Sequence, residues 1–441
     1  MSVRHLTVIR LPLVAAMILG AAQPGYADGW RVPMQGVKAL GSSYAGRAFI
    51  SDASVAWFNP AAMRKLNARK WTLTLAPPVI SFQLGYRDHG TTNLLGQPIA
   101  GSSSADGGAT AAVPHLYVVR RVTDRVSAGF GFNAPFGLGT DYGETYAGRY
   151  HGTKTSLRVF NLNPSVAVQV RPGLSVAAGL DVQRAQTTIA TMIDFGSVGA
   201  VSGLGLAPQG HDGKLEFTGS SWAVGYDVSL LWDASDRTRV GLVYRSKVTH
   251  GFDGTADFTV PTAAAPLTGG GLVFADGGAA TSLTMPHDVA VNLSQALNDR
   301  WMLLGDVSWS AWSAFKTLEV TFDNPLQPAI TQDHSWRNTV RGAVGGEYRA
   351  SDRWTWRAGA AYEMAPVPDK TRGPRLPEKN HVWMSAGVTR RFSDTSSIDI
   401  SYSNLRTKTA PLALTDPLAG TLAADVRWRL NIVAISWNKS F

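Results

Sequence analysis

The sequence predicts an all-β protein: a 14-stranded antiparallel transmembrane β-barrel, plugged by an N-terminal hatch and preceded by a signal peptide. Three observations lead to this prediction. Short turns such as 171–173 and 351–353 are followed by apolar–polar alternation of period two, which indicates ribbons with one apolar and one polar face. The start of the chain has the features of an export signal. The composition combines 45 Gly with only 17% charged residues, as expected where lipid-facing and lumen-facing residues alternate.

Residues 1–27 are the predicted signal peptide. Arg4 and Arg10 precede an apolar stretch over 11–22, and a small-residue cleavage pattern ends before Asp28. No later stretch of the sequence reaches the roughly 18 uninterrupted apolar residues of a membrane helix. If the exported chain spans a membrane, it must therefore do so as a closed barrel. The signal by itself also fits a soluble periplasmic protein.

Residues 28–67 are the predicted hatch, because they read as short loops and helical turns and not as another hairpin. A wide barrel becomes an open channel unless something fills it. In this segment, Asn59-Pro60-Ala61 predicts a helix start, since proline suits the first helical position and asparagine caps it. Trp57 and Phe58 are expected to pack against the barrel wall.

Residues 68–441 are the predicted barrel. Strands are expected at 70–87, 113–122, 125–135, 154–170, 174–190, 215–232, 238–260, 280–297, 301–322, 336–350, 353–363, 381–392, 396–406 and 425–441. Short turns alternate with longer loops, so the short turns are assigned to the periplasmic side. In the last strand the apolar residues change parity after Ile432, which predicts a bulge there.

Composition and motifs narrow the function. The absence of cysteine excludes thiol catalysis and Cys-based zinc sites. The formal charge of +9 is scattered, so we expect no nucleic-acid partner. Neither a Gly-x-Ser-x-Gly elbow nor a His-Glu-x-x-His motif occurs, so we expect neither enzymatic activity nor a cofactor. Two alternatives from other classes are an outer-membrane lipolytic enzyme and, more strongly, a general diffusion porin, which would show steady ion conductance.

Basic residues assigned to the lumen by strand parity are the candidates for ligand binding: Arg158, Arg184, Arg245 and Lys247. An arginine fork is suited to hold a carboxylate. The alternative is that these bases pair across the lumen with Asp181, Asp306 or Glu363, because a barrel lumen is generally polar.

Several segments in order along the chain resemble the FadL-type family of outer-membrane importers of long-chain fatty acids and hydrocarbons. The segments lie at 39–48, 52–61, 136–140, 147–150, 161–164, 237–247, 312–315, 366–368 and 376–377, and the terminal Phe441 resembles the assembly signal of outer-membrane barrels. The resemblance implies a 14-stranded barrel, a hatch and passive movement of a hydrophobic ligand to a lateral opening. It also implies outer-membrane lipid, lipopolysaccharide and the barrel-assembly machinery as partners.

The resemblance places a lateral gate at Asn133, Pro135 and Phe136. Pro135 cannot donate a ladder hydrogen bond, so pairing should fail locally; the alternative is that it merely ends a strand. One departure concerns the substrate: where fatty-acid importers carry a base after the stretch that 312–318 matches, this chain has Glu319, and the second expected base falls near Ile189. Glu319 is therefore the fifth candidate for ligand contact, and its side chain would repel the carboxylate of an ionised fatty acid. Neutral hydrocarbons therefore remain an alternative to fatty acids, which the family favours.

Overall fold

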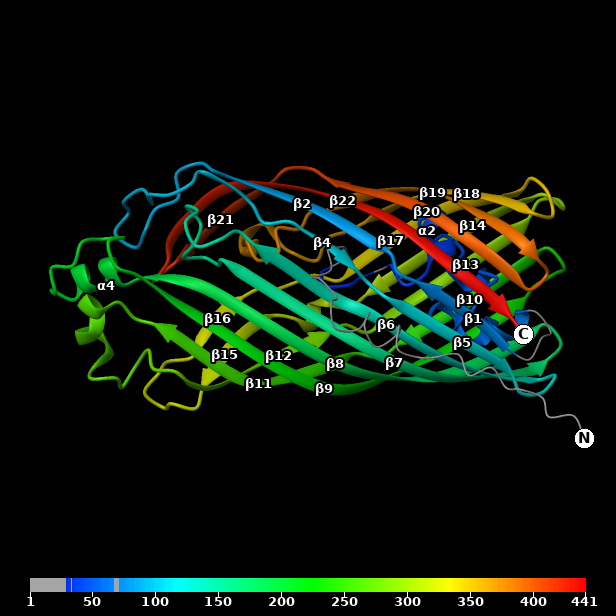
Figure 1. The fold of residues 1–441 in the computed structure, drawn as a ribbon, viewed down its shortest axis with the longest axis horizontal. Coiled ribbons are helices and arrows are strands. Elements are labelled where there is room, and N and C mark those ends of the chain that lie inside the picture. The colour runs from blue at the N-terminus through cyan, green and yellow to red at the C-terminus, as the bar shows by residue number, and fades with distance from the viewer. Residues whose placement is uncertain (1–28, 33, 67–70) are drawn as a thin grey trace, which may run out of the picture.

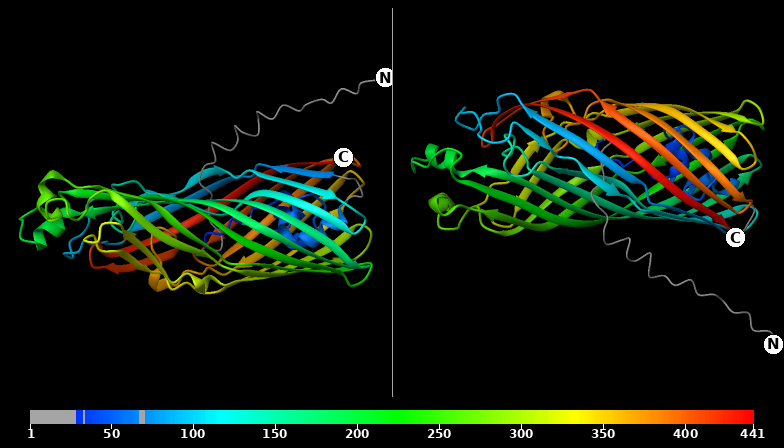
Figure 2. Two further views of the ribbon diagram at one scale, coloured as in Figure 1. Left: turned by 90° about the horizontal axis from the view of Figure 1, so that it is seen from below. Right: turned by 45° about the horizontal axis from the view of Figure 1, so that its top comes forward.

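The computed structural model describes residues 29–32, 34–66 and 71–441. Over these residues, antiparallel strands form a single sheet that closes on itself (Figures 1 and 2). The predicted signal peptide, residues 1–27, lies outside the described residues, as do the first and last residues of the predicted hatch. Within the described part of the chain, no helix is both long enough and apolar enough to cross a membrane.

In the described residues the barrel has 14 antiparallel passes, several of which are divided by a bend. Hydrogen bonds from β22 to β1 and β2 close it. The strands are β1 (Trp71–Ala76), β2 (Val79–Asp88), β3 (Ser104–Asp106), β4 (Ala109–Ala112), β5 (His115–Arg121), β6 (Val126–Asp141), β7 (Lys154–Arg171), β8 (Leu174–Asp194), β9 (Asp212–Asp233), β10 (Thr238–Arg245), β11 (Val248–Thr259), β12 (Gly277–Met285), β13 (Asp288–Ala296), β14 (Trp301–Ser310), β15 (Thr317–Phe322), β16 (Ile330–Asp333), β17 (Thr339–Arg349), β18 (Trp354–Glu363), β19 (His381–Ser393), β20 (Ser396–Thr407), β21 (Ala410–Asp416) and β22 (Gly420–Ser440).

The described helices are all short. Four precede the barrel: α2 (Val37–Gly41), η1 (Arg47–Phe49), α3 (Val55–Phe58) and η2 (Pro60–Lys65). The others lie in connections between strands: α4 (Phe195–Val201), η3 (Thr262–Thr268), η4 (Trp312–Ala314) and η5 (Asp369–Thr371).

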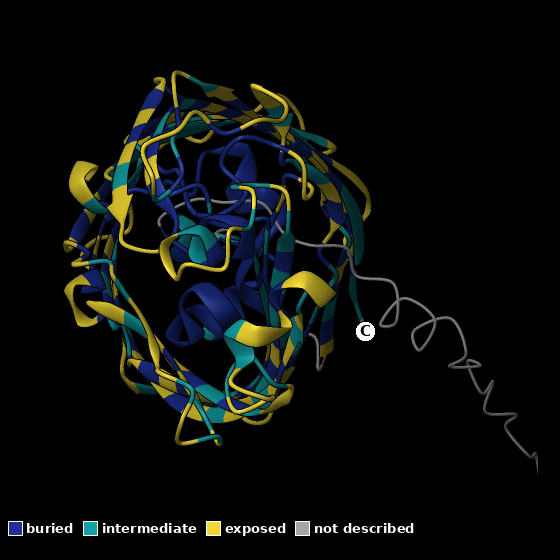
Figure 3. Ribbon diagram, turned by 90° about the vertical axis from the view of Figure 1, so that its left-hand side faces the viewer, coloured by how far each residue is buried: buried dark blue, intermediate teal, exposed yellow. Residues whose placement is uncertain are grey.

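Alternation along the strands builds a wall with two different faces. On β9, Trp222, Val224, Tyr226 and Val228 are exposed, whereas the intervening Asp227 is fully buried. The end-on view in Figure 3 shows buried and exposed stretches alternating around the wall. The outward apolar residues form the belt that a barrel presents to lipid.

The described residues between 29 and 66, called the inner segment here, lie inside the barrel (Figure 3). Helix α2 packs against β19 and β20, where the Ser401 hydroxyl donates to the Val37 carbonyl at 2.8 Å. Glycines of the wall make this contact possible: a Cβ on Gly359 would lie 2.1 Å from the Ser42 carbonyl oxygen. The inner segment therefore fits a wall whose side chains leave space for its backbone.

The predicted bulge near Ile432 is wrong. The register of β22 against β2 and β20 runs without a shift, and Val426, Trp428, Leu430 and Ile432 all point inward. These apolar side chains are buried in the barrel, Trp428 against the ring of Phe82 at 6.1 Å. Apolar residues occur on both faces of this strand because the filled lumen provides a second apolar environment.

Candidate functional site

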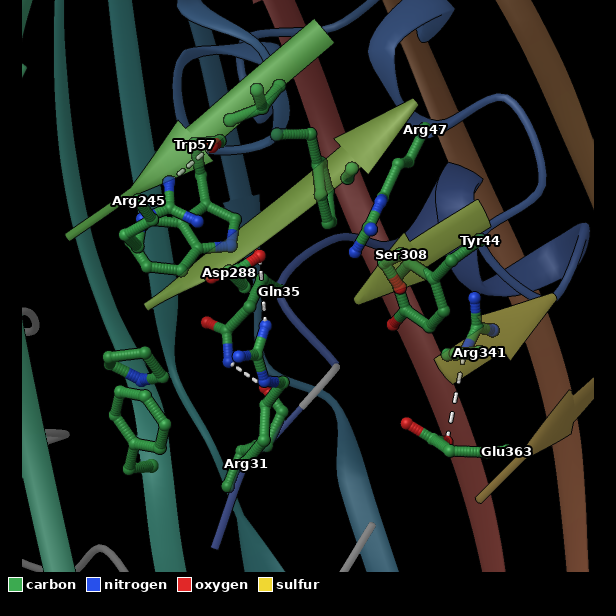
Figure 4. A pocket seen from close by; sticks show the side chains of 16 residues that line it. Arg31, Gln35, Tyr44, Arg47, Trp57, Arg245, Asp288, Ser308, Arg341 and Glu363 are labelled. Carbon is green, nitrogen blue, oxygen red and sulfur yellow. Dashed lines mark hydrogen bonds and ion pairs between the residues drawn. The ribbon is translucent and has the colours of Figure 1, made fainter. Parts of the chain in front are cut away.

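A narrow pocket of about 50 Å3 lies between the inner segment and the barrel wall (Figure 4). The inner segment lines it with Arg31, Val32, Gln35, Tyr44, Arg47, Trp57 and Phe58, and β6, β10, β13, β14, β17 and β18 provide the remaining residues. A cavity of this size holds a few water-sized groups at most. A long apolar ligand therefore does not fit into this pocket as it stands.

Every arginine in the pocket lining faces a carboxylate. Arg31 lies 3.2 Å from Asp288, and Arg47 lies 3.0 Å from Asp306. Arg341 lies 3.5 Å from Asp306. These carboxylates are almost fully buried, so each needs its cationic partner to offset the cost of desolvation. The pocket thus contains paired charges on both of its sides.

Arg341 extends this pairing to a second carboxylate, since its Nε lies 3.7 Å from Glu363. The Glu363 carboxylate also accepts a hydrogen bond from Trp383 Nε1 at 2.7 Å. On the side of the inner segment, Arg341 donates to the Ser43 carbonyl at 2.5 Å. Arg341 therefore ties the inner segment to charged groups of the wall.

Arg245 joins the inner segment to the wall at a second place. Its guanidinium carbon lies 3.6 Å from the centroid of the Trp57 ring, and Nη2 donates to the Trp57 carbonyl at 2.9 Å. On its other side, Nε lies 3.3 Å from the fully buried Asp181. Arg245 thus has an acidic partner, as the alternative to ligand binding expects, but this partner lies two strands away along the wall and not across the lumen.

The asparagine of the hatch motif caps η2. The Asn59 side chain accepts from the Ala61 N–H at 3.1 Å and donates to the Leu230 carbonyl at 3.1 Å. Pro60 occupies the first position of η2, where the missing N–H costs nothing. Trp57 and Phe58 are 6% exposed, so both side chains are buried between the inner segment and the wall.

Strand pairing fails beside the pocket. β5 pairs with β6 only as far as Leu116 and Phe132, and the register between β6 and β7 shifts between Asn133 and Phe136. Pro135, which cannot donate a ladder hydrogen bond, lies at this break, where the strand pairing is already interrupted. The alternative that Pro135 merely ends a strand is wrong, because β6 continues to Asp141.

The inner segment satisfies the backbone groups that the break sets free. The Val32 N–H donates to the Pro135 carbonyl at 2.8 Å, and the Gly137 N–H donates to the Trp30 carbonyl at 2.8 Å. Gln35 Nε2 donates to the Ala134 carbonyl at 2.8 Å. The inner segment therefore replaces β5 as the partner of this stretch of β6.

Aromatic side chains gather next to this contact. Trp30 packs against Phe315 with ring centroids 4.6 Å apart and against Trp336 at 4.8 Å. Trp312 lies 5.1 Å from Trp336 and 6.5 Å from Phe136. This cluster is suited to apolar and aromatic ligands, since rings provide large apolar faces.

Below the inner segment, a second cavity of about 740 Å3 opens towards the end with the short turns. Its lining is mainly polar and includes Lys38, Arg239, Glu347 and Arg357. The apolar cluster therefore lies on one side of the inner segment and a hydrated space on the other.

The structure contradicts the lumen assignment of two basic candidates. Along β7 and β8 the buried lumen residues are odd-numbered, for example Asn161 and Asp181, whereas Arg158 and Arg184 have the parity of the exposed Leu162 and Leu180. Arg184 lies over the exposed ring of Trp222 at 5.5 Å. Arg158 and Arg184 are therefore on the outer face of the barrel.

Two further candidates also lie outside the pocket. Lys247 is exposed on the connection between β10 and β11, and Glu319 is exposed on β15, where the neighbouring Val320 is the buried residue. The prediction that Glu319 faces a ligand carboxylate is therefore wrong. Of the five candidates, only Arg245 lines the pocket.

Sequence reasoning missed Arg31 and Arg47 because both lie in the inner segment, where no strand periodicity indicates a direction. Arg341 had a usable signal. It shares its parity on β17 with Thr339, which is also buried, and its register partner on β18 is Glu363.

A closed antiparallel barrel with an outward apolar belt and an inner segment in its lumen has the architecture of a membrane-spanning barrel with a filled interior. The chain belongs to the family of outer membrane protein transport proteins (OMPP1/FadL/TodX), whose profile matches residues 18–441. It is therefore an outer-membrane transporter for hydrophobic compounds.

The relatives include proteins named as fatty-acid transporters and proteins named only as outer membrane proteins. The chain is 28% identical to the long-chain fatty acid transport protein of Escherichia coli O6:H1, over 82% of this chain and 83% of that protein. It is 27% identical to outer membrane protein P1 of Haemophilus influenzae, over 90% of each chain.

Two solved structures share the fold. A FadL homologue of Pseudomonas aeruginosa superimposes with a TM-score of 0.86 at 23% identity, covering 94% of this chain and all of that chain. The toluene transporter TodX of Pseudomonas putida superimposes with a TM-score of 0.69 at 17% identity, covering 91% of this chain and 98% of that chain.

Proposed function

We propose that this protein imports long-chain fatty acids by passive diffusion, and that residues 28–67 act as a hatch whose displacement opens a lateral exit at Asn133, Pro135 and Phe136. The observation that carries the proposal is the bonding of the inner segment to Pro135 and Gly137 of β6. If the inner segment withdraws, this stretch of β6 loses its partner, and the break between β5 and β6 opens towards the membrane.

The pocket favours an amphipathic ligand. Arg31 and Arg245 are attached to buried carboxylates, and a ligand carboxylate that displaced one of these partners would be held by an arginine fork. The aromatic cluster around Trp30 would receive the acyl chain.

Neutral aromatic or aliphatic hydrocarbons are the second candidate. The observation in their favour is that each arginine of the pocket lining already faces a carboxylate, so a neutral ligand needs no exchange of ion pairs. A toluene transporter shares the fold.

The hatch is tested by locking it to β6. Arg31 and Phe136 are bridge partners, and the hydrogen bonds on both sides of them make this a non-hydrogen-bonded pair, whose Cα atoms are close enough for a disulfide. The chain has no cysteine of its own, so the double variant Arg31→Cys/Phe136→Cys contains only this pair. We expect that proteoliposomes with the oxidised double variant take up no long-chain fatty acid, and that uptake of the fatty acid appears after the disulfide is reduced.

Both single-cysteine variants serve as controls, since they carry the same side-chain losses but cannot close the disulfide. Equal uptake by the oxidised and reduced double variant would contradict a hatch that must leave β6. High ion conductance of the wild type in a planar bilayer would favour the general diffusion porin.

The substrate is tested by comparing a saturated long-chain fatty acid with the alkane of the same chain length. We expect saturable uptake of the fatty acid, with competition by other fatty acids and not by the alkane. Saturable uptake of the alkane alone would assign the protein to hydrocarbon transport.

Two membrane partners complete the proposal. Phe441 lies at the end of β22, is 59% exposed and pairs through its backbone with Trp71, so its side chain is accessible for the barrel-assembly machinery. Deleting Phe441 should reduce the folded protein in the outer membrane while the unfolded chain accumulates. Lipopolysaccharide is the second partner.

A further inference from the structure

The outer wall carries a polar pocket of about 490 Å3 on strands β7, β8, β9 and β11, which lie side by side in Figure 1. Its charged lining residues are Lys154, Arg158, Arg184 and Asp253. Hydroxyl and amide groups fill the space between them: Ser156, Gln186, Thr187, Thr188, Thr218, Ser220 and Thr255.

Strand register shows that this pocket faces away from the lumen. Arg158 is opposite Gln186, which is opposite Ser220, which is opposite Asp253. The first three have the even-numbered parity of the outward residues on β7, β8 and β9, and Asp253 is itself exposed on β11. The pocket therefore opens to the surroundings of the barrel.

The height of the pocket follows from the tryptophans of β9 (Asp212–Asp233). Trp222 and Trp232 are 64% and 47% exposed, and both point outward. The two positions are ten residue steps apart, which span roughly 33 Å of strand, and a tilt of about 40° reduces this to about 25 Å, the height of an apolar belt. The two tryptophans thus mark its two aromatic girdles.

The pocket lies above the upper girdle. Trp232 is next to the short turn to β10, so Trp222 marks the side with the long loops, which is the extracellular side. Arg184 lies over the Trp222 ring, and Ser220 lies two residues before Trp222 on β9, on the side of the long loop that precedes this strand. This is the level of the head groups of the outer leaflet.

The positive charge of the pocket is not neutralised from within the protein. Among the described residues, Lys154, Arg158 and Arg184 make no ion pair within 4.0 Å; the neighbouring Glu216 binds Lys214 at 2.9 Å. Three bases thus face one acid in the lining, and Arg158 Nε is buried without a hydrogen-bond partner. A buried donor of this kind is costly unless an external acceptor binds it.

We propose that this pocket binds the phosphate groups of the phosphorylated glycolipid of the outer leaflet, lipopolysaccharide. Guanidinium groups form strong charge-assisted bonds to phosphate oxygens, and the hydroxyl groups supply further donors. The acyl chains of the glycolipid would then lie along the apolar belt below Trp222. This inference specifies the proposed lipopolysaccharide contact but does not depend on transport, so its test measures no uptake.

The absence of cysteine allows a test confined to this pocket. In Ser220→Cys, the introduced thiol is the only one, and its alkylation by a small charged maleimide is followed in detergent. We expect diphosphoryl lipid A to slow alkylation at least about tenfold. The same lipid without phosphates, and inorganic phosphate alone, should not slow it.

Charge variants decide whether the bases are responsible. In the Ser220→Cys background, Arg158→Gln/Arg184→Gln should abolish the protection, whereas Arg158→Lys/Arg184→Lys should retain part of it. Arg390→Gln is the matched control, since Arg390 also points outward but lies over Trp354. It should leave the protection unchanged.

Three outcomes would overturn the proposal. Equal protection by the dephosphorylated lipid would reduce the effect to acyl-chain packing, and protection by inorganic phosphate alone would indicate a site for free anions. Full protection in Arg158→Gln/Arg184→Gln would show that these bases do not bind the head group.

Discussion

The guanidinium of Arg245 stacks on the ring of Trp57 at 3.6 Å and donates to the carbonyl of the same residue at 2.9 Å. Arg245 belongs to β10 and Trp57 to α3, so this contact fastens the inner segment to the wall. On the side away from Trp57, the Asp181 carboxylate lies 3.3 Å from Arg245 Nε. The wall therefore presents a preformed cation to the ring of the inner segment.

Replacing Arg245 by Met should loosen the inner segment. The change removes the stacking and the hydrogen bond to Trp57, and it leaves Asp181 buried without its cation, for a combined cost of roughly 2–5 kcal/mol. We expect faster hydrogen exchange of residues 29–66 and higher ion conductance. Arg245→Lys retains the charge, so its hydrogen exchange and its ion conductance should lie between those of Arg245→Met and those of the wild type. Unchanged hydrogen exchange in both variants would show that Arg245 does not hold the inner segment.

A side chain at Gly359 should displace α2. A Cβ there would lie 2.1 Å from the Ser42 carbonyl oxygen, so the backbone of the inner segment must move. Gly359→Val should therefore raise ion conductance and expose the inner segment to protease. The matched control is Gly342→Val on β17, where a Cβ meets nothing within 4 Å. A similar effect of both substitutions would indicate general damage to the barrel.

Removing the cap of η2 should have a smaller effect. Asn59→Ala loses the bonds to the Ala61 N–H and the Leu230 carbonyl. We expect a loss of about 1–2 kcal/mol in the stability of the inner segment, without loss of the barrel. Asn59→Asp keeps the acceptor for the Ala61 N–H and should therefore recover part of the lost stability. Hydrogen exchange of 59–66 measures both.

Substitution of Glu319 should not change the substrate. Its side chain is exposed on β15, on the face opposite to Val320, and does not line the pocket. Glu319→Lys should therefore take up a fatty acid and an alkane as the wild type does, within about twofold, or roughly 0.4 kcal/mol. A gain of fatty-acid uptake in this variant would place Glu319 on the ligand path.

Acid should loosen the loop between β6 and β7. Burial lowers the pKa of His151 in this loop to about 4, below its usual 6.5, so the folded loop contains neutral histidine. A lowered pKa of a base means that the unfolded loop binds the proton more tightly, and stability falls as the pH drops from about 6.5 towards 4. The loss from this residue reaches about 3 kcal/mol.

Hydrogen exchange of residues 142–153 at pH 7.5, 6 and 4.5 measures this effect, after correction for the intrinsic pH dependence of exchange. In His151→Asn, the corrected exchange rate of this loop should depend less on pH than it does in the wild type. If the exchange of the wild type and of the variant depends equally on pH, the titration of His151 does not set the stability of the loop.

Much of the barrel was predictable because its determinants are local. Period-two alternation on β9 and β18 and short turns at one end follow from neighbouring residues, so the strand number and orientation could be inferred. Alternation failed as a guide on β22, where Leu430 faces a filled lumen and Ile435 faces lipid, so that both faces are apolar.

The candidate site was predictable only in part. Near Arg158 and Arg184 the outer face of the wall is polar, since these residues lie at and above the upper girdle, whereas buried apolar residues such as Leu157 and Val159 face inward. The usual rule that the polar face of a strand points into the lumen therefore fails here. The pocket also needs Arg31 and Arg47, whose directions depend on how the inner segment docks.

Residue order alone is enough to show that this chain forms a β-barrel with an apolar belt and carries the motifs of its family, because hydrophobic alternation, turn residues and short motifs act over a few neighbouring positions. The tertiary structure alone decided which bases meet the lumen, where the wall breaks and which groups close the break. These contacts join residues as distant as Val32 and Pro135, or Trp57 and Arg245. Their geometry arises only when the barrel closes around the inner segment.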